Sequence, residues 1–115
     1  MAKSYQEITQ RITNNMREIG KARPGVMQGF QALSKGAMAE GHLDLKMKEF
    51  LALAIGIASQ CDGCIGFHVK KLVELGCTKE ELAEVLGVCV YMGGGPKLMY
   101  AAEAMHAFDE FSAKA

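Results

Sequence analysis

Apolar residues recur along this chain every three or four positions, the periodicity of helices that bury one face. In residues 4–20 the apolar side chains that share a face are Tyr5, Ile8, Ile12, Met16 and Ile19. A second run opens at Pro24, a residue favoured in the first turn of a helix. Its apolar stripe consists of Val26, Phe30 and Leu33, and the pattern frays between Gly36 and Gly41. No stretch alternates strictly as a half-buried strand does, so the pattern predicts helices throughout.

The middle of the chain predicts two further helices. Asp44 is suited to cap the N-terminus of the first of them. Residues 50–57 are apolar on nearly every side, which is typical of a central, buried helix. The next helix begins at Cys61 or Asp62 and ends at Gly76, a common C-terminal cap.

The last third of the chain predicts two more. Thr78-Lys79-Glu80-Glu81 has the pattern of a capping box, and Gly93-Gly94-Gly95-Pro96 breaks the chain before a final helix that starts at Pro96. Leu98, Ala101, Met105 and Phe108 line that helix. We therefore expect an all-α bundle of six helices with short connections, in which residues 1–115 form a single domain.

The composition narrows the possible functions. Lys plus Arg and Asp plus Glu number 13 each, so the chain lacks the basic surface expected of a protein that binds nucleic acid or acidic membranes. No apolar run approaches the roughly 20 residues that cross a bilayer, and no signal-peptide core is visible. We expect a cytoplasmic protein in which the four cysteines are catalytic, metal-binding or buried, and do not form a disulfide framework.

Cys61-Asp62-Gly63-Cys64 places two thiols at the expected start of a helix. There the free backbone N–H groups and the helix dipole favour negative charge on sulfur. His68 follows Cys64 by four residues, so both side chains lie on one face of the helix, one turn apart. A histidine in this position can accept the thiol proton directly or through one water.

Glu49, on the preceding helix, is the candidate partner of His68. In an antiparallel pair, Glu49 lies roughly 16 Å before the end of its helix and His68 roughly 10 Å into the next. Contact requires the turn or the crossing angle to take up this difference, or it forms between subunits. A carboxylate in contact with the imidazole would orient it and pass its proton onward. Without such contact, Glu49 is a solvated charge beside Lys46 and Lys48.

The remaining cysteines and histidines carry weaker signals. Cys89 lies in an apolar stretch and is interpreted as a small buried hydrophobe. Cys77, just after Gly76, is interpreted as a loop cysteine, with a third redox thiol as the alternative. The sequence identifies no partner for His42 or His106.

Glu49, Cys61, Cys64 and His68 together resemble the alkylhydroperoxidase AhpD and carboxymuconolactone decarboxylase family. The shared pattern is Glu, eleven residues, Cys-x-x-Cys, three residues, His. Residues 41–50 also resemble the start of the family's core helix, and residues 93–96 resemble the break before its final helix. The resemblance spans roughly residues 43–111 and implies an AhpD-like helical fold. The activity implied needs no organic cofactor and no metal.

In the AhpD branch the resemblance implies that Cys64 attacks a hydroperoxide and becomes a sulfenic acid, with which Cys61 condenses to form a disulfide. Glu49 and His68 would form the proton relay. A thiol reductant of the lipoyl, thioredoxin or glutaredoxin type would restore the dithiol. Helix electrostatics alone favour Cys61, because it is nearer the helix end. Cys61 is therefore the better site for exchange with an external disulfide. The two interpretations agree if Cys64 meets peroxide and Cys61 meets reductant.

Two departures from the fuller AhpD enzymes affect these expectations. Those enzymes carry a histidine between the cysteines, where this chain has Gly63, and they contain a second copy of the helical core. Small single-core members resemble this chain more closely and assemble as homo-oligomers. We therefore expect a trimer or hexamer, and the eight methionines suit an adaptable interface.

Three other functions stay open at this point. Cys61, Cys64 and His68, with Glu49 or water, offer a set of zinc ligands, although no second ligand pair has the usual finger spacing. A noncatalytic oligomeric scaffold would need none of the thiols. A carboxymuconolactone decarboxylase-like lyase acts on a lactone acid and does not rely on a CxxC dithiol.

Overall fold

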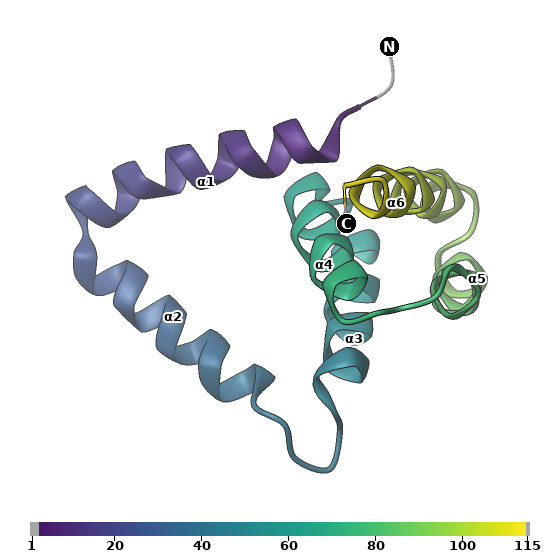
Figure 1. Cartoon of the computed structure of the whole chain (residues 1–115), viewed down its shortest axis with the longest axis horizontal. Helices are drawn as coiled ribbons and strands as arrows, with labels where there is room; N and C mark the ends of the chain where they lie inside the picture. The colour runs from purple at the N-terminus through teal and green to yellow at the C-terminus, as the bar shows by residue number, and fades with distance from the viewer. Residues whose placement is uncertain (1–2, 115) are drawn as a thin grey trace.

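The chain folds into a bundle of helices joined by short connections (Figure 1). The computed structural model describes residues 3–114, and within that range it contains six α-helices and no β-strand. In chain order they are α1 (Tyr5–Ala22), α2 (Pro24–Met38), α3 (Leu45–Ala58), α4 (Asp62–Glu74), α5 (Lys79–Gly93) and α6 (Gly95–Ser112). The predicted all-α, six-helix architecture is confirmed.

Side-chain caps set where four of these helices begin. The N-capping residues of α1, α3, α4 and α5 are Ser4, Asp44, Cys61 and Thr78, respectively. The side chain of each accepts a hydrogen bond from the backbone N–H of the residue three positions further on. Thr78 and Glu81 complete the predicted capping box. The helices α2 and α6 carry a proline in the first turn instead, where its missing N–H costs nothing.

Two glycines set where helices end. Gly76, after α4, has a φ of 79°, and Gly94, between α5 and α6, has a φ of 71°. Glycine adopts this left-handed region without the steric cost that a Cβ imposes. The predicted break near residues 93–96 is confirmed, although α6 begins at Gly95, one residue before Pro96.

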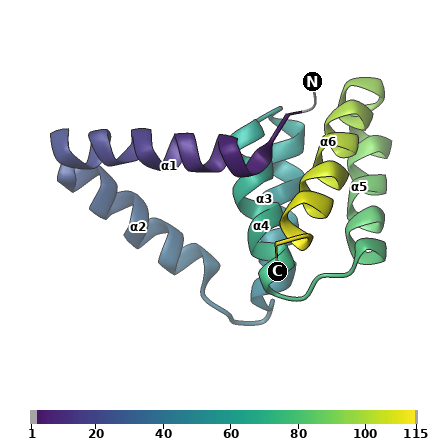
Figure 2. The same ribbon diagram turned by 45° about the horizontal axis from the view of Figure 1, so that its top comes forward.

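The core lies among α3, α4, α5 and α6, and the first turns of α1 close one side of it (Figure 2). Its largest fully buried side chains are Tyr5, Leu53, Ile57, Ile65, Val69, Leu72 and Leu82. Full burial of an aliphatic side chain of this size contributes about 1.5–3 kcal/mol. The helix α4 packs against α1, α3 and α6, so it has neighbours on several sides.

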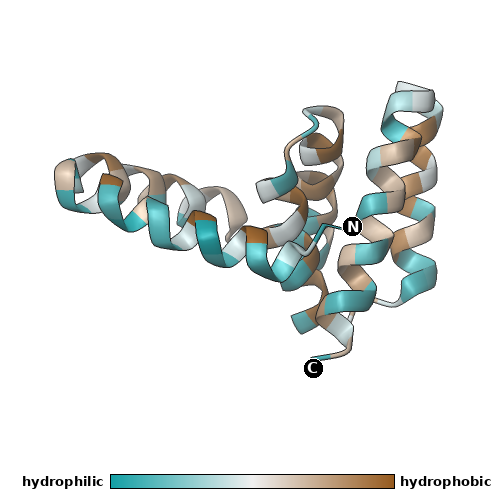
Figure 3. Cartoon of the chain, turned by 90° about the horizontal axis from the view of Figure 1, so that it is seen from above, coloured by the Kyte–Doolittle hydropathy of each residue, from teal (hydrophilic) through white to brown (hydrophobic). Residues whose placement is uncertain are grey.

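The helices α1 and α2 form an arm that extends away from the bundle (Figure 2). Within Pro24–Met38 no residue is buried, and the side chains of Val26, Phe30 and Leu33 are 59%, 63% and 68% exposed. Figure 3 shows apolar residues along this arm as well as in the bundle. The stripe that predicts α2 therefore does not face the core of its own chain.

The expectation that residues 50–57 form a central, buried helix is met on only one side of α3. Phe50, Leu53 and Ile57 are buried, but Leu51 is 49% exposed and Ile55 is 67% exposed. The reason is that α3 packs mainly against α4 and α5, and a helix covered on two sides keeps a third side open.

Candidate redox site

Cys61 and Cys64 lie at the first turn of α4. Cys61 is the N-cap, and its sulfur accepts a hydrogen bond of 3.1 Å from the backbone N–H of Cys64. The two Cα atoms are 5.3 Å apart, and the sulfurs lie at disulfide-bonding distance. Both residues are half-buried. Such a separation lets a disulfide open and close without rearrangement of the backbone.

A tight turn joins α3 to this site. The backbone N–H of Cys61 donates to the carbonyl of Gly56 at 3.0 Å. Gln60 has a φ of 55°, and among residues 3–114 it is the only non-glycine residue with a positive φ. Such a conformation is uncommon for a residue with a Cβ. Lys97 of α6 donates to the side-chain oxygen of Gln60 at 3.0 Å, which ties the turn to a second helix.

Gly56 lets α3 approach the dithiol closely. A Cβ at Gly56 would lie 2.7 Å from the Cβ of Cys64, which is too close for two carbon atoms. Glycine inside a helix lowers stability by about 0.5–1 kcal/mol relative to alanine. The close approach of the two helices explains why a glycine is present here despite that cost. Glu49 precedes Gly56 by two helical turns and lies on the same face of α3.

Glu49 and His68 are joined by a hydrogen bond within one chain. Oε1 of Glu49 and Nδ1 of His68 are 2.6 Å apart. Glu49 is 7% exposed, whereas the side chain of His68 is 31% exposed. The helical rise places Glu49 about 14 Å from the end of α3 and His68 about 9 Å from the start of α4. The long glutamate side chain spans the remaining offset, so contact across subunits is not required.

This arrangement determines what each group can do. An ionised Glu49 carboxylate can only accept hydrogen bonds, so Nδ1 of His68 carries the hydrogen between them. Nε2 is then left as a free acceptor, and His68 lies one turn after Cys64 on the same face of α4. The site combines two thiols, a proton acceptor and a buried carboxylate that orients it.

Gly63, between the two cysteines, lies against α1. A Cβ at this position would meet Cδ1 of Ile12 at 2.9 Å. A larger side chain, such as the histidine of the fuller AhpD enzymes, would therefore require Ile12 to move. The departure at Gly63 therefore lies where the start of α4 packs against α1, and the atom it meets is the end of a flexible side chain.

The structure also places the other cysteines and histidines. Cys77 is 7% exposed and Cys89 is half-buried, and burial raises the pKa of both thiols. A thiol with a raised pKa is a poor nucleophile at neutral pH. His42 is exposed in the loop before α3, and His106 of α6 has its Nε2 2.8 Å from the carbonyl of Lys3.

Sequence reasoning missed a polar cluster around Asp62. The hydroxyl of Tyr5 donates to Oδ1 of Asp62 at 3.0 Å, and Nζ of Lys3 lies 3.0 Å from Oδ2. These contacts join positions 57 and 59 residues apart in the chain. No local pattern could have indicated them, because they depend on how α1 crosses α4.

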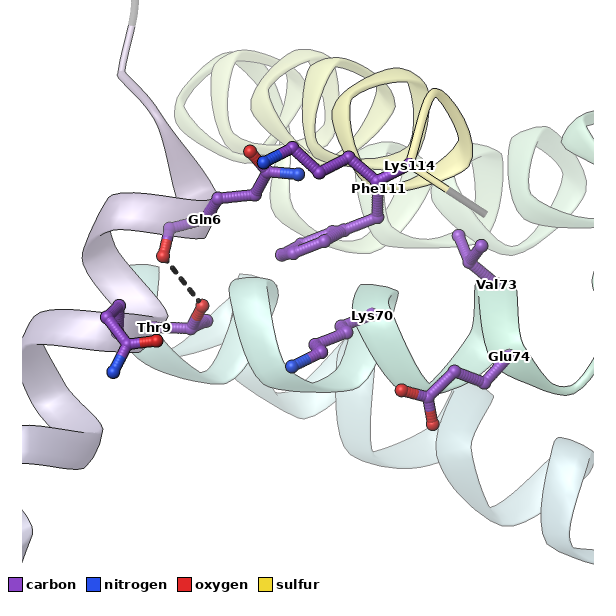
Figure 4. Close-up of a pocket in the computed structure, with 8 residues that line it drawn as sticks. Gln6, Thr9, Lys70, Val73, Glu74, Phe111 and Lys114 are labelled. Carbon is purple, nitrogen blue, oxygen red and sulfur yellow. Dashed lines mark hydrogen bonds between the residues drawn. The ribbon is translucent and has the colours of Figure 1, made fainter.

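A groove of about 480 Å³ lies elsewhere on α4, between α1, α4 and α6 (Figure 4). Its lining includes Thr9, Lys70, Val73 and Phe111, and a hydrogen bond joins Thr9 to the carbonyl of Gln6. Around the axis of α4, Lys70 and Val73 are turned by more than about 100° from Cys64 and His68. The groove therefore does not open onto the dithiol.

Among residues 3–114, no group of three or more His, Cys, Asp or Glu side chains is arranged to hold a metal ion. In the same part of the chain, no helix is both long enough and apolar enough to span a bilayer.

The fold and the site define a class: all-α proteins with a CxxC dithiol at a helix start, faced by a glutamate–histidine pair. The sequence profile of the carboxymuconolactone decarboxylase family matches residues 24–107, which is most of the chain. The chain belongs to the carboxymuconolactone decarboxylase family, as its resemblance to AhpD and these decarboxylases predicts.

Individual proteins are similar to this chain over most of their length. The crystal structure of apo-lpg0406, a carboxymuconolactone decarboxylase family protein from Legionella pneumophila, has a TM-score of 0.92 and 53% sequence identity, covering 94% of this chain and 96% of that one. An uncharacterized protein of Cupriavidus necator is 38% identical, over 89% of this chain and 90% of its own length. Uncharacterized protein 4 in the cox locus of Paracoccus denitrificans is 34% identical, over 81% and 84%.

Proposed function

We propose that this protein is a thiol-dependent oxidoreductase that reduces hydroperoxides or disulfides through a reversible Cys61–Cys64 disulfide. One observation carries the proposal: the two sulfurs lie at disulfide-bonding distance at the start of α4, and the next turn of that helix holds His68, which is hydrogen-bonded to Glu49 of α3. Free N–H groups at a helix start stabilise a thiolate. A histidine fixed by a buried carboxylate supplies the acceptor for the thiol proton.

In the peroxide reaction, Nε2 of His68 takes the proton of the Cys64 thiol. The thiolate attacks the terminal oxygen of the hydroperoxide, the one that bears the hydrogen, and the O–O bond breaks as the S–O bond forms. His68 returns the proton to the alkoxide that leaves, so the products are an alcohol and the sulfenic acid of Cys64. The Cys61 thiol then attacks this sulfur, and the disulfide forms with the release of one water.

A dithiol reductant completes the cycle. One of its thiolates attacks the sulfur of Cys61, and the Cys61–Cys64 bond breaks to give a mixed disulfide and the Cys64 thiolate. The second thiol of the reductant resolves the mixed disulfide, so the reductant leaves oxidised and the protein leaves reduced. We propose a reductant of the lipoyl, thioredoxin or glutaredoxin type. With a disulfide substrate, the same exchange steps run in the opposite direction.

Turnover assays on matched variants test this proposal. We expect the reduced protein to consume a small organic hydroperoxide, or the disulfide of a small dithiol, in the presence of dihydrolipoamide. Cys61→Ser and Cys64→Ser should each abolish multiple turnover, while Cys89→Ser, which removes a free thiol elsewhere, should retain it. Equal turnover by the native protein and Cys64→Ser would contradict the proposal.

We also propose that the protein assembles with copies of itself, as a trimer or hexamer, through the exposed stripe of α2. Val26, Phe30 and Leu33 share one face of that helix and are more than half exposed. Each square ångström of apolar surface removed from water contributes about 25 cal/mol. A second copy of the same chain would cover a surface that the bundle leaves open.

A further inference from the structure

Asp62, between the two cysteines, is tied to the N-terminal segment of the chain. Tyr5 donates to its Oδ1 at 3.0 Å, and Nζ of Lys3 lies 3.2 Å and 3.0 Å from its two carboxylate oxygens. Asp62 is the first residue of α4, directly after the N-cap Cys61. Two donors from one segment thus converge on the charged residue inside the CxxC motif.

Tyr5 is held firmly in this arrangement. The residue is fully buried, and a Cβ at Gly66, one turn after Asp62, would lie 3.4 Å from Cδ1 of its ring. Its backbone N–H donates to Oε1 of Glu110 at 2.8 Å, which anchors the start of α1 to α6. Burial and the hydrogen bond to Asp62 both raise the pKa of Tyr5, so its hydroxyl keeps its proton and stays a donor.

The position of Asp62 gives these contacts a chemical consequence. A carboxylate in the first turn of a helix occupies the same positive end that would stabilise a thiolate there. Its charge therefore opposes ionisation of the nearby thiols, to an extent set by how well that charge is neutralised. Tyr5 and Lys3 supply the neutralising hydrogen bonds.

We propose that Tyr5 and Asp62 are positioning residues that set the reduction potential of the Cys61–Cys64 pair, with Tyr5 acting through the Asp62 carboxylate. The inference rests on the redox function proposed above. Removal of the Asp62 charge stabilises the thiolate and so favours the reduced form. Removal of the Tyr5 hydroxyl leaves the charge of Asp62 less neutralised, and this change favours the disulfide. The two changes act in opposite directions.

The test is the equilibrium of the dithiol with glutathione, measured at about pH 9, where an ordinary cysteine is largely ionised. We expect Asp62→Asn to lower the equilibrium constant for disulfide formation by about threefold to tenfold. Tyr5→Phe keeps the buried ring and should raise the constant by about threefold. For a two-electron couple, a tenfold change corresponds to about 30 mV.

The double variant separates an electrostatic role from a structural one. If Tyr5 acts through Asp62, Tyr5→Phe has no further effect once Asp62 is asparagine, so the double variant matches Asp62→Asn alone. An equal effect of Tyr5→Phe in both backgrounds would overturn the proposal, because it would mean that the hydroxyl acts through packing. Tyr91→Phe and Asp109→Asn serve as controls, since Tyr91 is 85% exposed and Asp109 pairs with Lys79 at the surface.

The native protein distinguishes this inference from the function on which it rests. A native Cys61–Cys64 pair that never exchanges with glutathione would contradict the redox function itself. A native pair that exchanges, with a constant unchanged in Asp62→Asn and Tyr5→Phe, would overturn only the role of these two residues.

Discussion

At the scale of single residues, the chemistry depends on which nitrogen of His68 is free. Glu49 accepts from Nδ1 at 2.6 Å, which leaves Nε2 to take a proton. The carboxylate is buried and the imidazole is about one-third exposed, so the pair reaches from the core towards solvent. The proposed relay therefore has a fixed inner end and an outer end that water and substrate can reach.

A Glu49→Gln substitution tests this orientation. The amide can donate to Nδ1, and His68 would then carry its hydrogen on Nε2, where it cannot accept the thiol proton. We expect the second-order rate of peroxide consumption by the reduced protein to fall by about 100-fold or more, as measured by stopped-flow mixing. Glu74→Gln, in an exposed pair with Lys71, should leave the rate unchanged. Equal rates for native protein and Glu49→Gln would contradict the relay.

The sequence predicted part of this site, and the limit has a physical cause. Cys64 and His68 lie on one helix and Cys61 caps it, so their relation follows from local helical geometry. The contact of Glu49 depends on the offset between α3 and α4, which no local pattern determines. The contact of Tyr5 with Asp62 depends on the crossing of α1 over α4, so no local sequence pattern indicates it.

At the scale of elements, two glycines in helices show opposite requirements. A Cβ at Gly66 would lie 2.6 Å from Cγ2 of Thr9, whereas a Cβ at Gly87 would meet nothing within 4 Å. The first glycine allows α1 to lie close against α4, and the second sits on an exposed face of α5. Substitution of these two glycines should therefore affect stability differently.

Alanine at each position tests this packing. We expect Gly66→Ala to lower the free energy of unfolding by about 1–3 kcal/mol, because α1 must shift. Gly87→Ala should raise it by about 0.5–1 kcal/mol through the better helix propensity of alanine. Urea denaturation monitored by circular dichroism measures both changes in the free energy of unfolding. A stabilising Gly66→Ala would show that α1 does not pack on α4 as described.

The junction of α1 with α6 predicts a pH dependence. Burial alone would raise the pKa of Glu110, but hydrogen bonds from Ser4 and Tyr5 lower it overall from the ordinary value of 4.5. A carboxyl group with a lowered pKa in the folded state adds stability above the ordinary value, and this stability is lost as the pH falls below it.

We therefore expect the unfolding midpoint of the native protein to fall on acidification below about pH 4.5 more steeply than that of Glu110→Gln. Thermal melts between about pH 3 and pH 7 measure the difference. Parallel curves for the two proteins would mean that the hydrogen bonds of Glu110 with Ser4 and Tyr5 add no stability.

Helix boundaries were more predictable than helix environments. Asp44, Thr78, Gly76 and the break near Gly94 act through short-range backbone chemistry, so the sequence located them to within a residue or two. The apolar stripe of α2 has the same periodicity as a core-facing stripe, and yet it is exposed. Periodicity shows that a helix has an apolar face without showing what covers that face.

At the scale of the whole molecule, the arm of α1 and α2 gives the chain an extended outline, with principal extents of 41, 39 and 29 Å (Figure 1). A lone chain would expose the stripe of α2, together with Leu51 and Ile55 of α3. Exposed apolar surface of this kind marks interaction sites, which is why we propose self-assembly through α2.

A single charge in the stripe tests the assembly. We expect Phe30→Asp to convert the oligomer to smaller species while the helical content is retained, because Phe30 is 63% exposed and contributes little to the core. Gln28→Asp adds the same charge on the opposite face of α2 and should leave the assembly intact. Analytical ultracentrifugation measures both, and a native protein that sediments as a monomer would contradict the proposal.

Mass mapping of the thiols tests the central claim most directly. The fully reduced protein, with its four cysteines, is treated with one equivalent of hydroperoxide, alkylated and digested. We predict that Cys61 and Cys64 alone resist alkylation and are recovered in a disulfide-linked peptide, while Cys77 and Cys89 are alkylated. Full alkylation of all four cysteines after peroxide treatment would contradict the account.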